Sequence, residues 1–322
     1  MFMVGDIGGT NARFALAQIT AHREIIISDF EKYEADRFDR FEDIVTCFLD
    51  KFGHHPARAV FAVAGPVQNG EMRFTNRDWC LQEADIARNC KIEAVTLIND
   101  FAAMARAVPQ LKSDSFVDIQ PGTAVDGAPI VVAGPGTGFG ACLLVPQHND
   151  WRVLPGEGGH SSFAPVTDLE KDLVTALQRH WPIVSIEHIC GGANLEILTQ
   201  TMFELHDKKP EPVKPYEIIE RAEQGDMICR ALCDTRAAAT MAGLANMVLI
   251  GGARGGAVIA GGVAKHLADY LLAPEAIARF RAVWPDTDFL ANIPVRLMSN
   301  PIAPLMGAAA HCLGDIKQES LS

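Results

Sequence analysis

The sequence of 322 residues lacks features that would assign it to several other classes of protein. It has no run of basic residues and a formal net charge of -12, whereas proteins that bind duplex nucleic acid neutralise phosphates with clustered Lys and Arg. We therefore expect no nucleic-acid partner. The most apolar stretch, residues 237–263, is interrupted by Asn246, Arg254 and paired glycines, so we expect no membrane span there.

Signals for export and for thiolate metal binding are missing as well. The N-terminal segment MFMVGDIGGT has no basic region and reaches Asp6 early, unlike a signal peptide. The eight cysteines include no CxxC pair, and Cys229 and Cys233 stand one helical turn apart without a third ligand nearby. We therefore expect buried free thiols, no structural zinc and a cytoplasmic location.

The composition that is present, 48% hydrophobic and 21% charged residues, is that of a globular protein. Its length predicts two domains with a cleft between them. Pro109 should close a short helix, which makes residues 108–113 a crossing between domains. We expect a small α/β domain over residues 1–108, completed by a C-terminal helix within 301–322, and a large α/β domain over 109–300.

Apolar periodicity predicts the same order of elements in both halves of the chain. Each half begins with a hairpin whose turn is rich in glycine, at residues 6–11 and 134–138, and a later strand in each half ends at Gly65-Pro66 or Gly261-Gly262. This order indicates a duplicated architecture. The expected strands are 1–4, 12–17, 59–64, 94–98, 130–133, 141–145 and 257–260, and the expected helical segments are 41–52, 169–179, 216–247 and 304–313, the last stopped by Gly314.

The two glycine turns are candidate phosphate sites, because backbone N–H groups can approach a phosphate closely where no Cβ intervenes. Neither turn has the GxxxxGK[ST] pattern of a Walker loop, and either alone could be a plain hairpin turn. Asp6 adds a carboxylate that could hold Mg²⁺ through water.

Asn99 and Asp100 stand where a buried strand gives way to a helix. Asp100 could be a simple helix N-cap, or it could be a general base that accepts the proton of an attacking hydroxyl. The carboxyl ends of strands are where open α/β sheets bind ligands, which favours the second interpretation.

Three further polar residues are candidates for binding a sugar. Glu157 and His160 lie on the loop Gly156-Glu-Gly-Gly-His160, which could also be a surface turn, and Glu187 could be a solvated residue near the start of a helix. Sugar hydroxyls need both donors and acceptors, and carboxylates together with Asn99 and a histidine supply both.

Seven motifs carry a close resemblance to the bacterial glucokinase family, in order from about Val4 to Gly314. They are Gly5-Asp-Ile-Gly-Gly-Thr-Asn-Ala-Arg13, Ala64-Gly-Pro66, Thr75-Asn-Arg-Asp-Trp79, Ile98-Asn-Asp-Phe101, Gly134-Pro-Gly-Thr-Gly138, Leu154-Pro-Gly-Glu-Gly-Gly-His160 and Ala260-Gly-Gly-Val263. A related repressor and sugar-kinase family has a Cys-rich zinc motif after its EGGH-like segment. Here Ser161-Ser-Phe-Ala-Pro165 follows instead, which again argues against zinc.

The resemblance implies a two-domain actin-like ATPase fold, ribonuclease H-like, with a duplicated α/β core and an interdomain cleft. It implies phosphorylation of glucose by ATP with Mg²⁺, Asp100 as the base, and a homodimer as in many such enzymes. Glucose would bind at Asn99, Asp100, Glu157, His160 and Glu187. ATP would bind at Gly5, Asp6, Ile7, Gly8, Gly9, Thr10, Asn11, Gly134, Gly136, Thr137, Gly138, Gly261 and Gly262.

Other functions were weighed against this one. The enzyme could phosphorylate another hexose, or the chain could be a non-catalytic sugar sensor of the same fold. A DNA-binding regulator would need a helix-turn-helix ahead of the first hairpin, and only four residues precede Gly5. A chaperone-like or filament-forming ATPase would leave Asn99, Asp100, Glu157 and His160 without a shared purpose.

Overall fold

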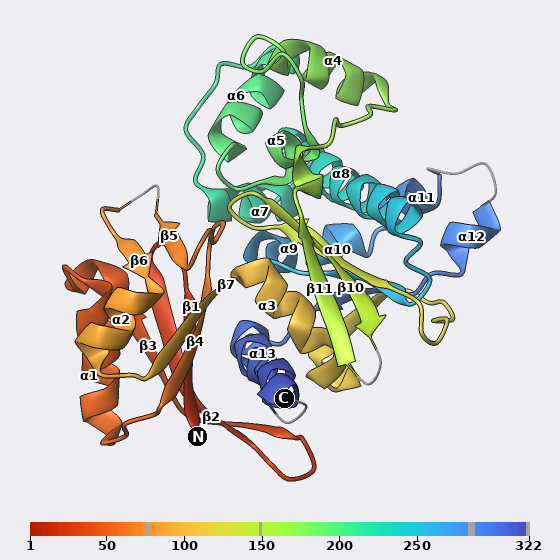
Figure 1. Cartoon of the computed structure of the whole chain (residues 1–322). Coiled ribbons are helices and arrows are strands. Elements are labelled where there is room, and N and C mark those ends of the chain that lie inside the picture. Colours follow the sequence, from red (N-terminus) through yellow and green to blue (C-terminus); the bar gives the residue numbers. More distant parts are fainter. Residues whose placement is uncertain (75–76, 148–149, 283–286, 320–322) are drawn as a thin grey trace. The chain divides into compact units, whose positions relative to one another are not determined.

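Two large mixed β-sheets organise the chain, one in each of its two units (Figure 1). The structure is a computed structural model and describes residues 1–74, 77–147, 150–282 and 287–319. Unit 1 comprises residues 1–113 and 300–322, and unit 2 comprises residues 114–299. Two parts of the predictions lie outside the described residues: residues 75 and 76 of the motif 75–79, and residues 320–322 of the predicted segment 301–322. The prediction of an α/β protein is confirmed.

The unit 1 sheet has the strand order β3-β2-β1-β4-β7. Strand β1 runs antiparallel to β2 and parallel to β4, which in turn is parallel to β7. Helices α1 and α2 cover one face, and α3 and α13 cover the other (Figure 1). The strands are β1 (Phe2–Ile7), β2 (Asn11–Ile19), β3 (Ile25–Glu34), β4 (Arg58–Val63) and β7 (Ala94–Asn99), with a separate ribbon of β5 (Glu71–Arg73) and β6 (Cys80–Gln82). The helices are α1 (Phe41–Phe52), α2 (Glu83–Cys90), α3 (Asp100–Ala107) and α13 (Ala303–Glu319).

Helix α1 has the bounds that its periodicity predicts. Its apolar residues at intervals of three and four form one buried stripe, which packs on the aromatic core of the sheet. The helix ends where Gly53 adopts a left-handed conformation, with φ 65°. Burial of this stripe therefore fixes both the position of α1 and the face of the sheet that it covers.

Helix α13 corrects one prediction, because it continues through Gly314 to Glu319. A glycine inside a helix costs about 1 kcal/mol relative to alanine, but it stops a helix only where the backbone turns away after it. The buried side of α13 packs against β1, β2 and β4 through Leu305, Ala308, Ala309 and Cys312. At Gly307 the helix lies so close to α3 that a Cβ would collide with the Ala103 carbonyl.

The unit 2 sheet has the strand order β11-β10-β9-β12-β13-β8. Strand β9 runs antiparallel to β10 and parallel to β12, and β12 is parallel to β13. The strands are β8 (Phe116–Gln120), β9 (Ile130–Pro135), β10 (Phe139–Gln147), β11 (Asp150–Gly156), β12 (Gly256–Ile259) and β13 (Val295–Met298). The helices are α4 (Asp168–Leu177), α5 (Ile186–Cys190), α6 (Leu195–Leu205), α7 (Pro215–Glu223), α8 (Met227–Gly251), α9 (Gly262–His266), α10 (Ala268–Leu271), α11 (Pro274–Arg281) and α12 (Thr287–Ala291).

Helix α8 is the central helix of the unit 2 core. Its buried residues are mostly Ala, Gly, Leu and Met, and they pack with residues of α5, α7, α11 and β9. The predicted helical segment 216–247 is divided at Gly225, which has φ 95°, so α7 and α8 are separate helices. No helix in the described residues has both the length and the apolarity needed to cross a membrane.

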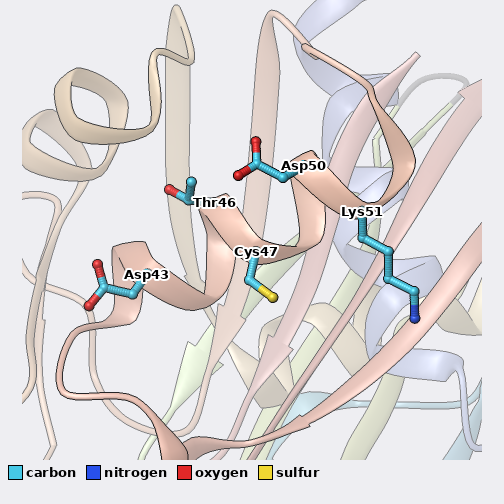
Figure 2. Close-up of a pocket in the computed structure, with 5 residues that line it drawn as sticks. All are labelled: Asp43, Thr46, Cys47, Asp50 and Lys51. Carbon is cyan, nitrogen blue, oxygen red and sulfur yellow. The ribbon is translucent and has the colours of Figure 1, made fainter.

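The prediction that the cysteines are buried is right for six and wrong for two. Cys47 and Cys80 are exposed, because each lies on the outward side of its helix or ribbon. Burial is the main cause that raises the pKa of Cys90, Cys229 and Cys233 to about 11. Cys47 lines a pocket with Asp43, Thr46, Asp50 and Lys51, all from α1 (Figure 2). Their side chains point in different directions, and none is a predicted site residue.

Candidate active site

In unit 1 the carboxyl ends of three parallel strands lie side by side. Ile7 of β1 is in register with Val63 of β4, which is in register with Asn99 of β7. The chain leaves these ends into the glycine turn 8–11, into Gly65 and into α3. The structure therefore brings the predicted residues 5–11 and Asn99-Asp100 to one edge of one sheet, where α/β proteins bind ligands.

Asn99, rather than Asp100, caps helix α3. Its Oδ1 accepts hydrogen bonds from the backbone N–H groups of Phe101 (3.0 Å) and Ala102 (3.2 Å). Its Nδ2 donates to the Gly65 carbonyl (3.1 Å) and to Asp100 Oδ1 (3.1 Å). The amide group thus holds the Asp100 carboxylate in place, and the interpretation of Asp100 as the N-cap is wrong.

Asp100 is the first residue of α3 and is half-buried. Burial, and secondarily the negative charge of Asp6, raise the pKa of its carboxyl to about 7. Hydrogen bonds from Phe101 N–H (2.9 Å) and Asn99 partly offset this rise. A carboxyl with a pKa near neutrality is suited to proton transfer at physiological pH.

Asp6 lies beside the first glycine turn and pairs with Arg13 across the β1–β2 hairpin, at 3.3 Å between Oδ2 and Nη2. Arg13 also donates to the Pro301 carbonyl (3.1 Å). Arg13 belongs to a motif of the sequence but had no predicted role. Its position opposite Asp6 in the hairpin register could have suggested the pair.

In unit 2 the second glycine turn is held by the segment that follows α5. Pro135 pairs with Phe139, which leaves residues 136–138 as the turn. Gly192 N–H donates to the Gly136 carbonyl (2.9 Å), and Ala193 N–H donates to the Thr137 carbonyl (2.9 Å). The turn is therefore supported along its length by backbone hydrogen bonds.

Glu187 joins this turn through its side chain. Its Oε2 accepts a hydrogen bond from Phe139 N–H (2.8 Å), and a Cβ on Gly138 would collide with the same oxygen. A side chain at position 138 would therefore push the Glu187 carboxylate out of this position. Sequence reasoning placed Glu187 near a helix start, which is confirmed, but missed this contact across 48 residues.

Glu157 and His160 lie on the loop between β11 and α4 and are exposed. His160 Nε2 lies 3.7 Å from Glu157 Oε2. The loop is joined to α5 because Ile186 N–H donates to the Ser161 carbonyl (3.0 Å). Glu157, His160 and Glu187 are thus carried by adjoining segments of unit 2.

The carboxyl end of β12 carries the last of the predicted site residues in unit 2. Ala260 N–H donates to the Ala133 carbonyl (3.0 Å), and the next residue, Gly261, has φ 109°, a conformation that favours glycine. Gly262 then begins α9. In the described residues we find no group of three or more His, Cys, Asp or Glu side chains arranged to hold a metal ion.

Comparisons with known proteins show the family to which the chain belongs. The Glucokinase family model matches residues 3–314. A glucokinase from Caulobacter sp. (strain K31) is 37% identical over 308 residues, covering 95% of this chain and 93% of its own length. The crystal structure of a glucokinase from an Antarctic psychrotroph has a TM-score of 0.86 and 33% identity, covering 98% of both chains. A glucokinase of the ROK family from Streptomyces griseus, solved with glucose and AMPPNP, shares the fold at 17% identity, with a TM-score of 0.62 over 96% of this chain and 97% of its own.

The likeness to the glucokinase from the Antarctic psychrotroph places the chain in the class of sugar kinases. The family match and the relatives at 31–37% identity narrow this class further. The chain belongs to the glucokinase family, and it is an enzyme.

Proposed function

We propose that this enzyme transfers the γ-phosphoryl group of ATP to the 6-hydroxyl of glucose, giving glucose 6-phosphate and ADP. The observation that carries the proposal is the Asp100 carboxyl, oriented by Asn99 and with its pKa raised to about 7, beside a glycine turn. The chain's family and the glucose and AMPPNP bound by the Streptomyces griseus structure support it.

Asp100 acts as the general base. Its carboxylate accepts the proton of the sugar hydroxyl while the hydroxyl oxygen forms a bond to the γ-phosphorus, and the bond from that phosphorus to the β–γ bridging oxygen breaks. Asn99 keeps the carboxylate in position through the 3.1 Å hydrogen bond to Oδ1. A properly positioned base of this kind contributes roughly 10² to 10⁴ in rate.

The candidate residues for the sugar hydroxyls stay predictions in each unit. In unit 1 they are Asn99 and Asp100, and in unit 2 they are Glu157, His160 and Glu187. Carboxylates accept hydrogen bonds from hydroxyls, while the amide and the imidazole can also donate them. The geometry of Glu187 supports a role in binding sugar hydroxyls. One of its oxygens accepts a hydrogen bond from Phe139 N–H, which restricts the direction of the carboxylate.

The candidate residues for the phosphates of ATP also stay predictions in each unit. In unit 1 they are residues 5–11, and in unit 2 they are Gly134, Gly136, Thr137, Gly138, Gly261 and Gly262. Mg²⁺ fits the carboxylates of unit 1, because Asp6 and Asp100 lie at one edge of the sheet: Asp6 is in register with Ala62 of β4, and Ala62 with Ile98 of β7, two residues before Asp100. Asp6 would hold the ion through water. When bound, Mg²⁺ supplies positive charge that neutralises the phosphate oxygens.

The finer description of the fold, an actin-like ATPase with a duplicated core, is part of the proposal. It is supported by matching strand directions in β3-β2-β1-β4-β7 and β11-β10-β9-β12-β13. Ala64 N–H donates to the Ile7 carbonyl (3.0 Å) in unit 1 as Ala260 N–H does to Ala133 in unit 2. The domain limits 1–108 and 109–300, the interdomain cleft, the homodimer and the cytoplasmic location remain predictions.

The proposal is tested by a coupled ADP-release assay over glucose, mannose, fructose and glucosamine with Mg-ATP. Glucose should give the highest kcat/KM. Faster turnover of another hexose would leave a sugar kinase but refute the assignment of glucose, because one inverted hydroxyl is discriminated by hydrogen-bond geometry. Turnover of none of them would refute both.

A further inference from the structure

Helix α8 carries a charged side chain within the apolar core of unit 2. Arg236 is 5% exposed, and its Nε has no hydrogen-bond partner among the described residues. The thiols of Cys190 and Cys233 are buried near it, and burial raises the pKa of both, so they are neutral and supply no counter-charge. Burying a charge without a counter-ion lowers the stability of the fold. The contacts of Arg236 should therefore show what role it has in the structure.

The guanidinium binds the C-terminal end of α5. Arg236 Nη2 donates to the carbonyl of Cys190, the last residue of that helix, at 2.8 Å. A cation is favoured at a helix C-terminus, where the carbonyl groups are without partners inside the helix. Thr240 strengthens the junction, since its hydroxyl lies 2.8 Å from the Arg236 carbonyl and 3.5 Å from Cys190 Sγ.

The residues that follow Cys190 hold the second glycine turn. Gly191 N–H donates to the Glu187 carbonyl (2.8 Å), and the next two N–H groups donate to the carbonyls of Gly136 and Thr137. Glu187 reaches the same turn through Phe139 N–H. Arg236 is therefore connected to the turn through the end of α5 and through two successive backbone hydrogen bonds.

We propose that Arg236 is a positioning residue, which acts through Cys190 to hold segment 187–193 and thereby the turn 136–138 in the geometry that binds the nucleotide phosphates. The inference rests on the proposed function, because it assumes that this turn binds ATP. The inference extends the proposed function by a residue that is buried in α8. Arg236 would set the affinity for the nucleotide without touching it.

The test replaces the charge while filling the space, with Arg236→Met. The substitution removes a buried charge without a counter-ion, which stabilises, and leaves the Cys190 carbonyl without its donor, which destabilises, so we expect the melting temperature to change by only a few degrees. The matched control is Arg230→Met, which makes the same change on an exposed part of α8, where Arg230 pairs only loosely with Asp234 at 3.7 Å. A second variant, Arg236→Lys, retains the charge and a donor.

We expect Arg236→Met to raise the KM for ATP and the Kd of AMPPNP roughly 10- to 100-fold, as displacements of about 1 Å in a binding site do. Hydrogen exchange of the Gly192 and Ala193 amides should become faster. Arg236→Lys should recover part of the affinity, and Arg230→Met should match the wild type.

Unchanged KM and AMPPNP affinity in folded Arg236→Met would overturn the inference. A fall in kcat that only parallels the loss of folded protein, with KM unchanged, would overturn it as well. A merely structural role reduces the amount of folded enzyme but does not alter nucleotide affinity in the molecules that remain folded. A wild-type protein that binds no AMPPNP would instead refute the proposed function, and the inference with it.

Discussion

Replacing Asp100 by Asn should inactivate the enzyme and at the same time stabilise it. The amide keeps the size of the side chain and an oxygen that can accept from Phe101 N–H, as Asp100 Oδ1 does at 2.9 Å. It cannot accept the proton of the sugar hydroxyl. The cap of α3 is unaffected because Asn99 provides it.

The gain in stability follows from the pKa of Asp100, which is raised from 3.8 to about 7 in the folded protein. A carboxyl with a raised pKa is harder to ionise when folded, so its ionisation lowers the free energy of unfolding as pH increases from about 4 to 7. Each pKa unit corresponds to about 1.4 kcal/mol, so the cost at pH 8 is up to about 4 kcal/mol. Because Asp100 is only half-buried, we expect Asp100→Asn to recover about 1 to 4 kcal/mol.

Thermal unfolding at pH 4 and pH 8 and kcat at saturating glucose and Mg-ATP measure both effects. The variant should melt several degrees above the wild type at pH 8 and near it at pH 4, and its kcat should be lower by about 10² to 10⁴. The control is Asp43→Asn, which changes an exposed aspartate in the first turn of α1 and should alter neither quantity. A folded Asp100→Asn protein with normal kcat would remove Asp100 from the mechanism.

Three further predictions concern pH, the second turn and the thiols. Since only ionised Asp100 can act as a base, kcat/KM should fall about tenfold per unit below pH 7, and a flat profile down to pH 5 would contradict this. Gly138→Ala pushes the Glu187 carboxylate aside and should raise the KM for glucose by up to about tenfold, and an unchanged KM would mean that the position of this carboxylate does not matter for the sugar. A thiol reagent should modify Cys47 and Cys80 rapidly in the native protein and all eight cysteines in denaturant, and more than two rapid thiols would show that the core opens readily.

Local patterns predicted much of unit 1. The helix 41–52 was recovered at both ends because its apolar stripe and Gly53 lie in one short window of sequence. The first strand was predicted to end at Val4 but continues to Ile7, since Asp6 and Ile7 pair with Ala62 and Val63 of β4. That pairing joins residues far apart in the chain, and no local pattern records it.

The candidate site was predictable as a set of residues but not as a set of contacts. A motif named Asn99 and Asp100, and the family resemblance added Glu187. The roles of cap and carboxylate within the first pair follow only from hydrogen-bond geometry. The bond from Phe139 to Glu187 depends on how α5 packs against β10. The sequence did not indicate that Arg236 is buried, because an arginine within a helical segment is usually solvated.

The packing of α13 against the unit 1 sheet has a consequence for biosynthesis. Leu305 and Ala308 cover one face of β1 and β4, yet about 190 residues of unit 2 separate them from the rest of unit 1. At roughly 5 to 20 residues per second, a ribosome needs about 10 to 40 s to make that stretch. Through this interval Val4 and Val60 lack their α13 partners, so the nascent chain presents to chaperones the part of this apolar sheet face that α3 does not cover, until α13 emerges.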